Sequence, residues 1–238
     1  MDINGRWDFG QPHETGMVDW GAYTLNGNAS AIGIDALIGG RSRGYSMART
    51  LGGQPNQVAT QGRRVMVAWV GTSPAAQSLP RDLSLNAKGE LLQAFVPELQ
   101  QLRNSSSLAS SQLELLARYT LTPTTTGVFG VHVLATPDGS ERTSIGVDLN
   151  RRMVFVDGTQ QGSDVLRAGP LLGSGTDIYM HVYVDHSIVT VLVNNQTALT
   201  VLVSPSSTTA VLASEYTDDV DGDYSLELDG WSLSSAGA

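Results

Sequence analysis

The stretch IYMHVYVDHSIVTVLVNNQTALTVLVSP, from Ile178 to Pro205, decides the fold of this chain. Its first eight residues alternate between apolar and polar or aromatic side chains, which is the pattern of a strand with one buried face. The pairs Asp185-His186 and Asn194-Asn195 interrupt the apolar runs, and such residues accept the left-handed conformation that tight turns require. The stretch therefore predicts a meander of at least three antiparallel strands.

Short runs of the same kind lie on both sides of this meander. They are rich in β-branched and aromatic residues, and Gly, Pro, Asn or Asp separates them. Such runs with turn signals between them are typical of an all-β sandwich or barrel. The clearest examples are VFGVHVLA from Val128, TSIGVDL from Thr143, RMVFVD from Arg152 and LELDGWSLSS from Leu226.

The first hundred residues are Gly-rich and contain fewer strand patterns. RRVMVAWV from Arg63 predicts a strand, and DLSLNAKGELLQAF predicts a hairpin that turns at residues 86–89. PELQQLR, from Pro97 to Arg103, predicts a helix because Pro and then an acidic residue stand in its first turn. A Ser-rich stretch follows, so we place a domain boundary near Asn104. The N-terminal part has too few strands to close a sheet and is interpreted as a piece of something larger.

Composition excludes several classes of function. The chain has 238 residues, of which 41% are hydrophobic and 16% charged, as in ordinary globular proteins. A net charge of −9 with only fourteen Lys and Arg opposes nucleic acid as a partner. No apolar run is long enough to span a membrane, and the first twenty residues carry charges instead of an apolar signal core. Since there is no Cys, disulfides and thiolate metal sites are excluded.

Two long segments carry a resemblance to a known family. GRRVMVAWVGTSPAAQSLPRDLSLNAKGELLQAFVPELQQLR, from Gly62 to Arg103, resembles the last propeller blade of glycoside hydrolase family 32, the invertases and fructan hydrolases. The stretch from Ile178 to Pro205 is similar to the paired strands of that family's C-terminal sandwich. Asp19-Trp20-Gly21 and GYSMARTL from Gly44 resemble earlier motifs, so the likeness covers most of the chain in the family's order.

The resemblance implies an all-β architecture: the terminal part of a five-bladed β-propeller followed by a C-terminal β-sandwich. Residues 1–104 would be the end of the propeller, with an insertion near 22–43, and residues 105–238 the sandwich. Family members place their catalytic carboxylates in the motifs Trp-x-Asn-Asp-Pro-Asn-Gly, Arg-Asp-Pro and Glu-Cys, and none of these occurs here. We therefore expect no catalytic residue in this chain. By resemblance, the complete protein would be extracellular or vacuolar.

The candidate substrate-binding residues lie in the N-terminal part. A retaining glycosidase needs two carboxyl groups roughly 5 Å apart, and no spacing rule brings Asp19 together with a second acid. The rings of Trp20, Tyr45 and Trp69 could pack against a fructosyl ring, because sugars present apolar faces to aromatic side chains. Trp69 also ends an apolar strand and is as well suited to a core.

No cofactor and no metal site is expected. The four His are not spaced as ligands, and the acidic stretch DDVDGDY from Asp218 lacks the closing Glu of a calcium loop. That stretch is interpreted as a solvated turn before the last strand. The aromatic residues Tyr179, Tyr183 and Trp231 are expected to pack between sheets or domains.

Two hypotheses from different classes remain open. In the first, the parent protein hydrolyses β-fructofuranosidic bonds of sucrose or fructans with retention, and this chain by itself is inactive. In the second, the chain is a non-catalytic carbohydrate-binding or interaction module derived from that family. Because the family's sandwich packs against its propeller, an isolated copy would expose an apolar interface and self-associate. The particular fructoside, and whether water or a sugar is the acceptor, also stay open.

Overall fold

The computed structural model describes residues 49–51, 65–67, 69–70, 76–161, 166–173 and 175–234. The chain divides into two compact units, Met1–Pro97 and Glu98–Ala238. Every strand pairing in the described residues is antiparallel. The predicted all-β class is confirmed.

The described strands of the first unit form two small sheets. A four-stranded sheet has the order β1-β2-β5-β6, and β3 pairs with β4 in a two-stranded sheet. A propeller blade is also a four-stranded antiparallel sheet, but the assignment of residues 1–104 to a propeller stays a prediction. The strands are β1 (Arg49–Leu51), β2 (Val65–Val67), β3 (Trp69–Val70), β4 (Ala76–Gln77), β5 (Arg81–Leu85) and β6 (Leu91–Phe95).

The hairpin of β5 and β6 turns where the sequence predicts it. The side-chain Oδ1 of Asn86 accepts hydrogen bonds from the backbone N–H groups of Lys88 and Glu90, at 2.9 and 3.0 Å. Gly89 has a φ of 77°, a conformation that Gly adopts without steric cost. The turn therefore depends on one Asn and one Gly, and both are recognisable in the sequence.

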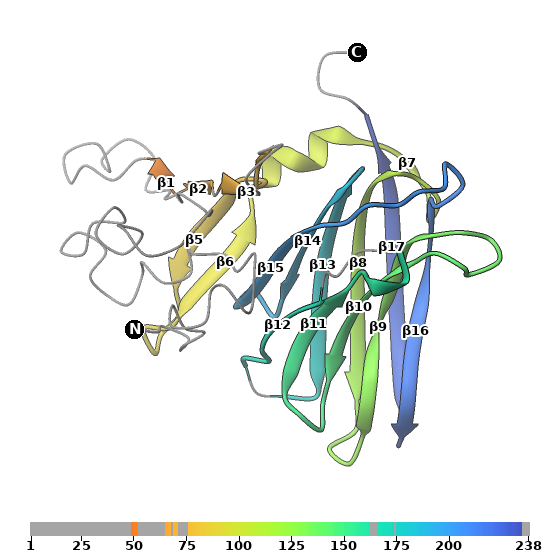
Figure 1. The fold of residues 1–238 in the computed structure, drawn as a ribbon. Coiled ribbons are helices and arrows are strands. Elements are labelled where there is room, and N and C mark those ends of the chain that lie inside the picture. The colour runs from red at the N-terminus through yellow and green to blue at the C-terminus, as the bar shows by residue number, and fades with distance from the viewer. Residues whose placement is uncertain are drawn as a thin grey trace. The chain divides into compact units, whose positions relative to one another are not determined.

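The second unit is a sandwich of two antiparallel sheets, which Figure 1 shows face to face. The six-stranded sheet has the order β15-β14-β13-β8-β17-β7, and the five-stranded sheet has the order β12-β11-β10-β9-β16. Its strands are β7 (Arg103–Ser106), β8 (Gln112–Leu121), β9 (Thr126–Ala135), β10 (Thr143–Asp148), β11 (Met153–Asp157), β12 (Leu166–Pro170), β13 (Asp177–Asp185), β14 (Ile188–Val193), β15 (Thr197–Leu202), β16 (Leu212–Asp221) and β17 (Tyr224–Leu233); a short 3-10 helix, η3 (Thr159–Gln161), follows β11.

The predicted meander is confirmed as β13, β14 and β15. His186 turns the first pair with a φ of 53°, and Asn194 and Asn195 turn the second with φ values of 52° and 57°. Asn194 also fixes its turn through its side chain. Its Oδ1 accepts the N–H of Tyr179 at 2.9 Å, and its Nδ2 donates to the carbonyl of Leu172 at 3.1 Å.

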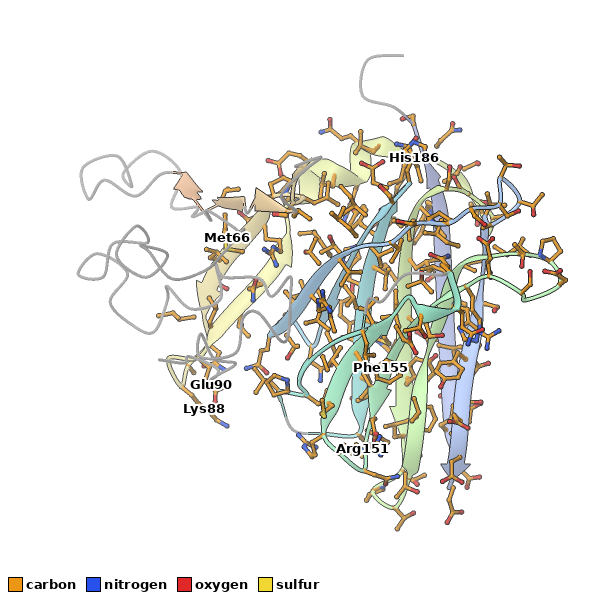
Figure 2. All side chains as sticks on the ribbon, viewed as in Figure 1. Met66, Lys88, Glu90, Arg151, Phe155 and His186 are labelled. Atoms are coloured by element: carbon orange, nitrogen blue, oxygen red, sulfur yellow. The ribbon has the colours of Figure 1, made fainter. Side chains whose placement is uncertain are left out.

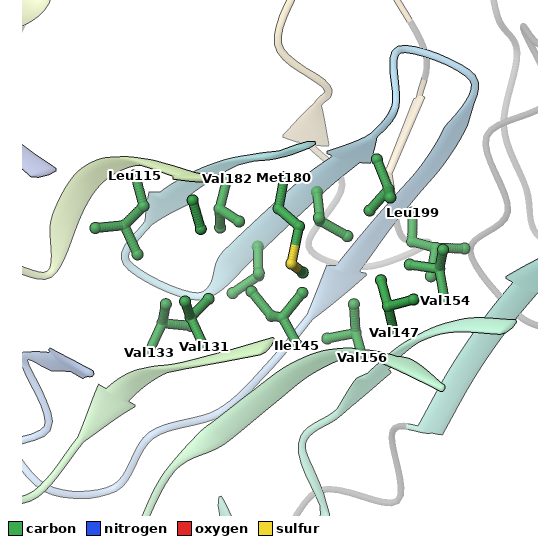
Figure 3. Close-up of a cluster of buried hydrophobic side chains, with 14 of the residues drawn as sticks. Leu115, Val131, Val133, Ile145, Val147, Val154, Val156, Met180, Val182 and Leu199 are labelled. Atoms are coloured by element: carbon green, nitrogen blue, oxygen red, sulfur yellow. The ribbon is translucent and has the colours of Figure 1, made fainter. Parts of the chain in front are cut away.

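The core fills the space between the two sheets with aliphatic side chains (Figure 3). Met180 and Val182 of β13 are fully buried, and so are Ile145 of β10 and Val156 of β11. These residues alternate along each strand with residues of the outer face, because successive side chains of a strand point to opposite sides. Removing the surface of such side chains from water is the main force that holds the two sheets together.

The predicted helix is present as the 3-10 helix η2 (Pro97–Leu102), and it ends one residue before the predicted end at Arg103. Arg103 begins β7, which pairs with β17 so that Ser105 lies opposite Ser232. Asn104, where the sequence predicts a domain boundary, therefore lies in a strand of the sandwich sheet. A strand can form here without apolar residues because the pairing uses backbone groups.

The acidic stretch from Asp218 was predicted to be a turn, but its first four residues form part of a strand. Residues 218–221 complete β16, and only the following Gly222 and Asp223 connect this strand to β17. Gly222 has a φ of 96° and closes the connection. The prediction is right for the turn and wrong for residues 218–221, because acidic side chains that point to solvent on an edge strand leave no apolar pattern to recognise.

Candidate functional site

The most deeply buried acidic group of the described residues is the carboxylate of Glu114 on β8. Its neighbours Leu113 and Leu115 face the core, so Glu114 points to the opposite, outer face of the six-stranded sheet. Its side chain nevertheless has no exposed surface. In the register of the sheet Glu114 lies between Tyr183 of β13 and Trp231 of β17.

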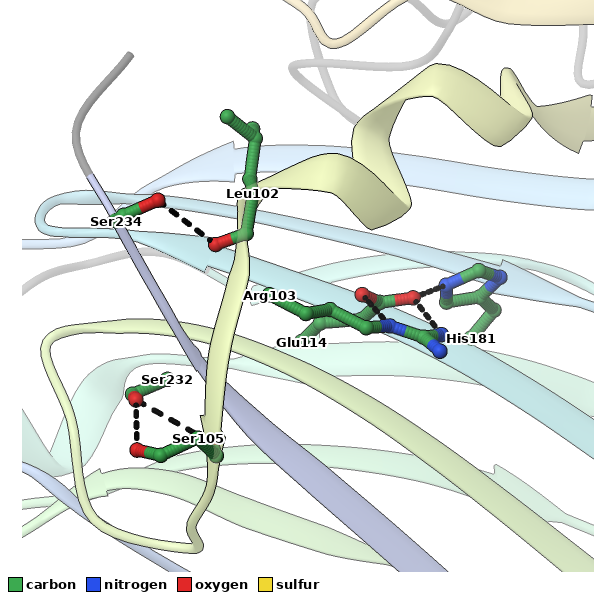
Figure 4. Close-up of polar contacts among 7 residues, drawn as sticks. All are labelled: Leu102, Arg103, Ser105, Glu114, His181, Ser232 and Ser234. Carbon is green, nitrogen blue, oxygen red and sulfur yellow. Dashed lines mark hydrogen bonds and ion pairs between the residues drawn. The ribbon is translucent and has the colours of Figure 1, made fainter. Parts of the chain in front are cut away.

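The side chains of an Arg and a His hold this carboxylate (Figure 4). Arg103 of β7 donates through Nε to Oε2 at 2.7 Å and through Nη2 to Oε1 at 2.8 Å. The Nε2 atom of His181 on β13 lies 2.8 Å from Oε1. The paired geometry with Arg is a strong form of charge-assisted hydrogen bonding because two parallel bonds form at once.

Aromatic rings surround this ion pair. The guanidinium carbon of Arg103 lies 3.8 Å from the ring centroid of Trp231, which is a cation–π contact. The ring of His181 lies 5.1 Å from that of Tyr183 and 6.2 Å from that of Tyr179, between centroids. These aromatic residues lie on the outer face, so they do not pack between the two sheets, and the alternative that they pack between domains stays a prediction. We call Arg103, Glu114, His181, Tyr183 and Trp231 the Glu114 cluster.

The electrostatics of the Glu114 cluster keep Glu114 ionised. Burial by itself raises the pKa of this carboxyl, but hydrogen bonds from Arg103 and His181 outweigh burial and lower the pKa to about 2. The pKa of Tyr183 is raised, first by burial and then by the neighbouring carboxylate. Glu114 is therefore a permanent anion at ordinary pH, and Tyr183 is a permanent neutral phenol.

This arrangement predicts a pH dependence of stability. The pKa of Glu114 is lowered from 4.5 to about 2 on folding, so the carboxylate stabilises the native state above pH 4.5 and this contribution is lost as the pH falls towards 2. Between pH 5 and pH 3 the loss is about 2 kcal/mol. Urea unfolding at both pH values, compared between the native chain and Glu114→Gln, measures it. Equal pH dependence of the two proteins would contradict the assignment.

The Glu114 cluster is not suited to bond cleavage. A retaining glycosidase requires one carboxylate as nucleophile and a second, protonated carboxyl roughly 5 Å away. Both oxygens of Glu114 are already hydrogen-bonded, and its lowered pKa is the opposite of what a proton donor needs. Within the described ranges, no group of three or more His, Cys, Asp or Glu could hold a metal ion. The cluster fixes β7 to β8 and β13.

The residues predicted to bind substrate, Asp19, Trp20, Tyr45 and Trp69, all belong to the first unit. Asp19, Trp20 and Tyr45 lie outside the described residues. Trp69 begins β3, and its backbone lies opposite Gln77 of β4. The role of these four residues in sugar binding stays a prediction. Sequence reasoning did not single out Glu114, although an acidic residue inside the run LELLA is a signal that could have found it.

A second group of polar and aromatic side chains lies on the outer face of the five-stranded sheet. The ring of Tyr216 on β16 stacks on that of His132 on β9, with centroids 4.6 Å apart and planes at 28°. The Nδ1 atom of His132 lies 3.0 Å from the hydroxyl of Ser144 on β10. The pKa of His132 is lowered by burial and by the charge of Arg142, which favours a neutral ring.

The described residues of the second unit thus define an antiparallel β-sandwich with a buried ion pair on one outer face and a stacked aromatic pair on the other. Residues 87–229 match the family described as Glycosyl hydrolases family 32 C terminal. The chain belongs to this family, which confirms the resemblance seen in the sequence. No curated protein matches the chain.

Solved structures of larger proteins share the fold. An exo-inulinase from Aspergillus awamori is 18% identical with a TM-score of 0.63, and the match covers 74% of this chain and 41% of that one. Fructan 1-exohydrolase IIa from Cichorium intybus is 16% identical with a TM-score of 0.65, covering 79% and 48%. A mutant β-fructofuranosidase from Bombyx mori in complex with sucrose is 12% identical with a TM-score of 0.55, covering 81% and 41%.

This chain corresponds to less than half the length of each of these proteins. At sequence identities this low, the similarity shows a shared fold alone. In the described part of the chain no helix has the length and apolar character needed to cross a membrane.

Proposed function

We propose that this chain is the C-terminal portion of a retaining glycoside hydrolase that acts on β-fructofuranosidic bonds of sucrose or fructans. In this proposal the chain is catalytically incomplete and contributes the sandwich as structural support. The observation that carries the proposal is the family match over residues 87–229 in a sequence with none of the three carboxylate motifs. The Glu114 cluster supports it, because its buried carboxylate is neutralised rather than poised for chemistry.

The proposal predicts no fructose release by the purified chain from sucrose or inulin. The chemical reason is that glycoside hydrolysis with retention needs two carboxyl groups in one site. Fructose is measured after prolonged incubation, with a complete exo-inulinase as positive control. The chain with Glu114→Gln is assayed in parallel, so that any weak activity can be tested for dependence on the one buried carboxylate. Robust turnover by the chain would overturn the proposal that it is incomplete.

The nature of the parent protein needs a separate measurement. We expect the transcript upstream of Met1 to encode the Trp-x-Asn-Asp-Pro-Asn-Gly motif in the same reading frame. A stop codon without that motif would contradict the hydrolase parent.

The same proposal predicts that isolated copies of the chain associate, through the face that meets the propeller in this family. Sedimentation velocity at two protein concentrations tests it, and a sedimentation coefficient that rises with concentration is the expected result.

The second candidate function is a non-catalytic carbohydrate-binding module. The observation that favours it is the stacked pair of His132 and Tyr216 on the outer face of the five-stranded sheet. Sugar-binding sites combine aromatic rings, which pack against C–H groups, with polar groups that bond to hydroxyls. Binding of fructan by a chain that releases no fructose would favour this candidate.

A further inference from the structure

The outer face of the five-stranded sheet contains a row of four residues directly opposite one another. Phe155 of β11 lies opposite Gly146 of β10, Gly146 opposite Gly130 of β9, and Gly130 opposite Tyr216 of β16. Two aromatic residues are thus separated by two residues without side chains. Both aromatic residues are half-buried, so part of each remains open to solvent.

The two glycines allow the row to stay flat. A Cβ atom on Gly146 would lie 2.4 Å from the Cζ atom of Phe155, so the ring occupies the space that a side chain at this position would need. Aromatic side chains laid over a cross-strand Gly are a known way to stabilise a sheet. That role accounts for the position of Phe155, which Figure 2 labels on β11. It does not account for the polar groups around Tyr216.

Arg142 is the least satisfied of these polar groups. It precedes Ser144 by two residues, the spacing at which residues of a strand share a face. Its Nη1 donates to the carbonyl of Gly139 at 2.8 Å, but its buried Nε has no hydrogen-bond partner among the described residues. A buried donor without a partner costs about 1–3 kcal/mol, so its presence needs a reason. The charge of Arg142 acts on both His132 and Tyr216, which places it beside the stacked pair.

The backbone next to this group is irregular. Leu134 of β9 has a φ of 50°, which is uncommon for a residue with a bulky side chain. The pairing of β16 with β9 shifts its register between Leu212 and Ser214, beside His132. Bulges of this kind redirect side chains and occur often next to functional sites. Such strain persists only where the surrounding structure holds it.

We propose that this face, made of Phe155, Tyr216, His132, Arg142 and Ser144, binds a chain of neutral sugars without cleaving it. The expected sugar is a fructan, and this part of the inference rests on the proposed function. Rings that are partly open to solvent can pack against the C–H groups of sugar rings, while Arg142 donates to hydroxyl groups.

Charge favours a neutral ligand over an ionic one. Asp157 lies opposite Ser144 on the same face, so this face carries an acidic group as well as Arg142. The net charge of −9 opposes polyanions in general. A ligand with many hydroxyl groups both donates and accepts hydrogen bonds, and it can therefore use Arg142 and Asp157 together. The flat row suits an extended polymer, because successive sugar units can contact successive strands.

Affinity electrophoresis of the full chain in gels that contain inulin tests the proposal. We expect inulin to retard the native chain, and Tyr216→Ala or Arg142→Gln to weaken the apparent affinity at least tenfold. Tyr216→Phe keeps the ring and should bind nearly as well. Leu85→Ala, which changes an exposed apolar residue of β5, is the matched control and should bind as the native chain does. Thermal unfolding of each variant verifies that it is folded.

Four outcomes are distinguishable. Retardation that depends on Tyr216 and Arg142 supports the binding face. Retardation that is unchanged in both variants overturns its location, and no retardation overturns binding altogether. Equal retardation by dextran overturns the assignment to fructans. None of these results depends on fructose release. The gel experiment therefore tests sugar binding by this face, and the fructose assay separately tests the hydrolase proposal.

Discussion

Replacing Glu114 with Ala is expected to lower the free energy of unfolding of the sandwich by about 3–5 kcal/mol. The substitution leaves the guanidinium of Arg103 and the ring of His181 without their shared carboxylate, and the side chain of Arg103 is only 23% exposed. Breaking a buried ion pair by removing one partner is costly because the other charge stays desolvated. The same change also removes the two side-chain hydrogen bonds that link β7 to β8, whereas the backbone pairing of β7 with β17 remains.

Urea unfolding of the full chain measures this effect, and amide hydrogen exchange in β8 and β13 shows whether the loss lies in the sandwich. Glu227→Ala is the matched control, because Glu227 is an exposed carboxylate on β17 opposite Arg118. Its expected effect is within about 0.5 kcal/mol. If both variants lose the same small amount, the Glu114 cluster does not stabilise the fold.

Gly130→Ala is expected to cost about 3 kcal/mol or more, at the upper end of the range for overpacking. A Cβ atom at this position would lie 1.9 Å from the backbone oxygen of Ile145, so β9 and β10 would have to separate. The carbonyl of Gly130 also accepts a 2.5 Å hydrogen bond from the buried hydroxyl of Tyr119, and separation of the strands would disturb that bond. The pKa of this phenol is raised by burial, so it remains a donor.

Gly169→Ala in β12 serves as the comparison for this prediction. The nearest atom to a Cβ there is Cγ2 of Thr197 at 3.3 Å, and a side-chain methyl group can shift. Thermal unfolding should separate the two variants clearly, with a much lower melting temperature for Gly130→Ala alone. Similar melting temperatures would mean that strand separation is easier than the close approach at Gly130 indicates.

The sequence by itself determined the local elements of this protein. Alternating apolar residues predicted β13, and β-branched runs predicted β14 and β15. The pair Asn194 and Asn195 predicted the turn between the last two strands, which the φ values confirm. Asn86 and Gly89 likewise identified the hairpin of β5 and β6. These predictions succeed because strand periodicity and turn conformation depend on residues that are neighbours in the chain. The family resemblance was also readable, since it rests on ordered local motifs.

Only the tertiary structure decided which strands lie side by side and which side chains meet. His181 is 67 residues from Glu114 in the chain, and the two meet because β13 and β8 are adjacent in the sheet. Tyr216 reaches His132 because β16 pairs with β9, although β10 to β15 lie between them in sequence. Pairing of distant strands depends on the packing of the whole core, and no local pattern encodes it. Which residues join Glu114 in its cluster, and which surround Tyr216, was therefore beyond what local sequence patterns could show.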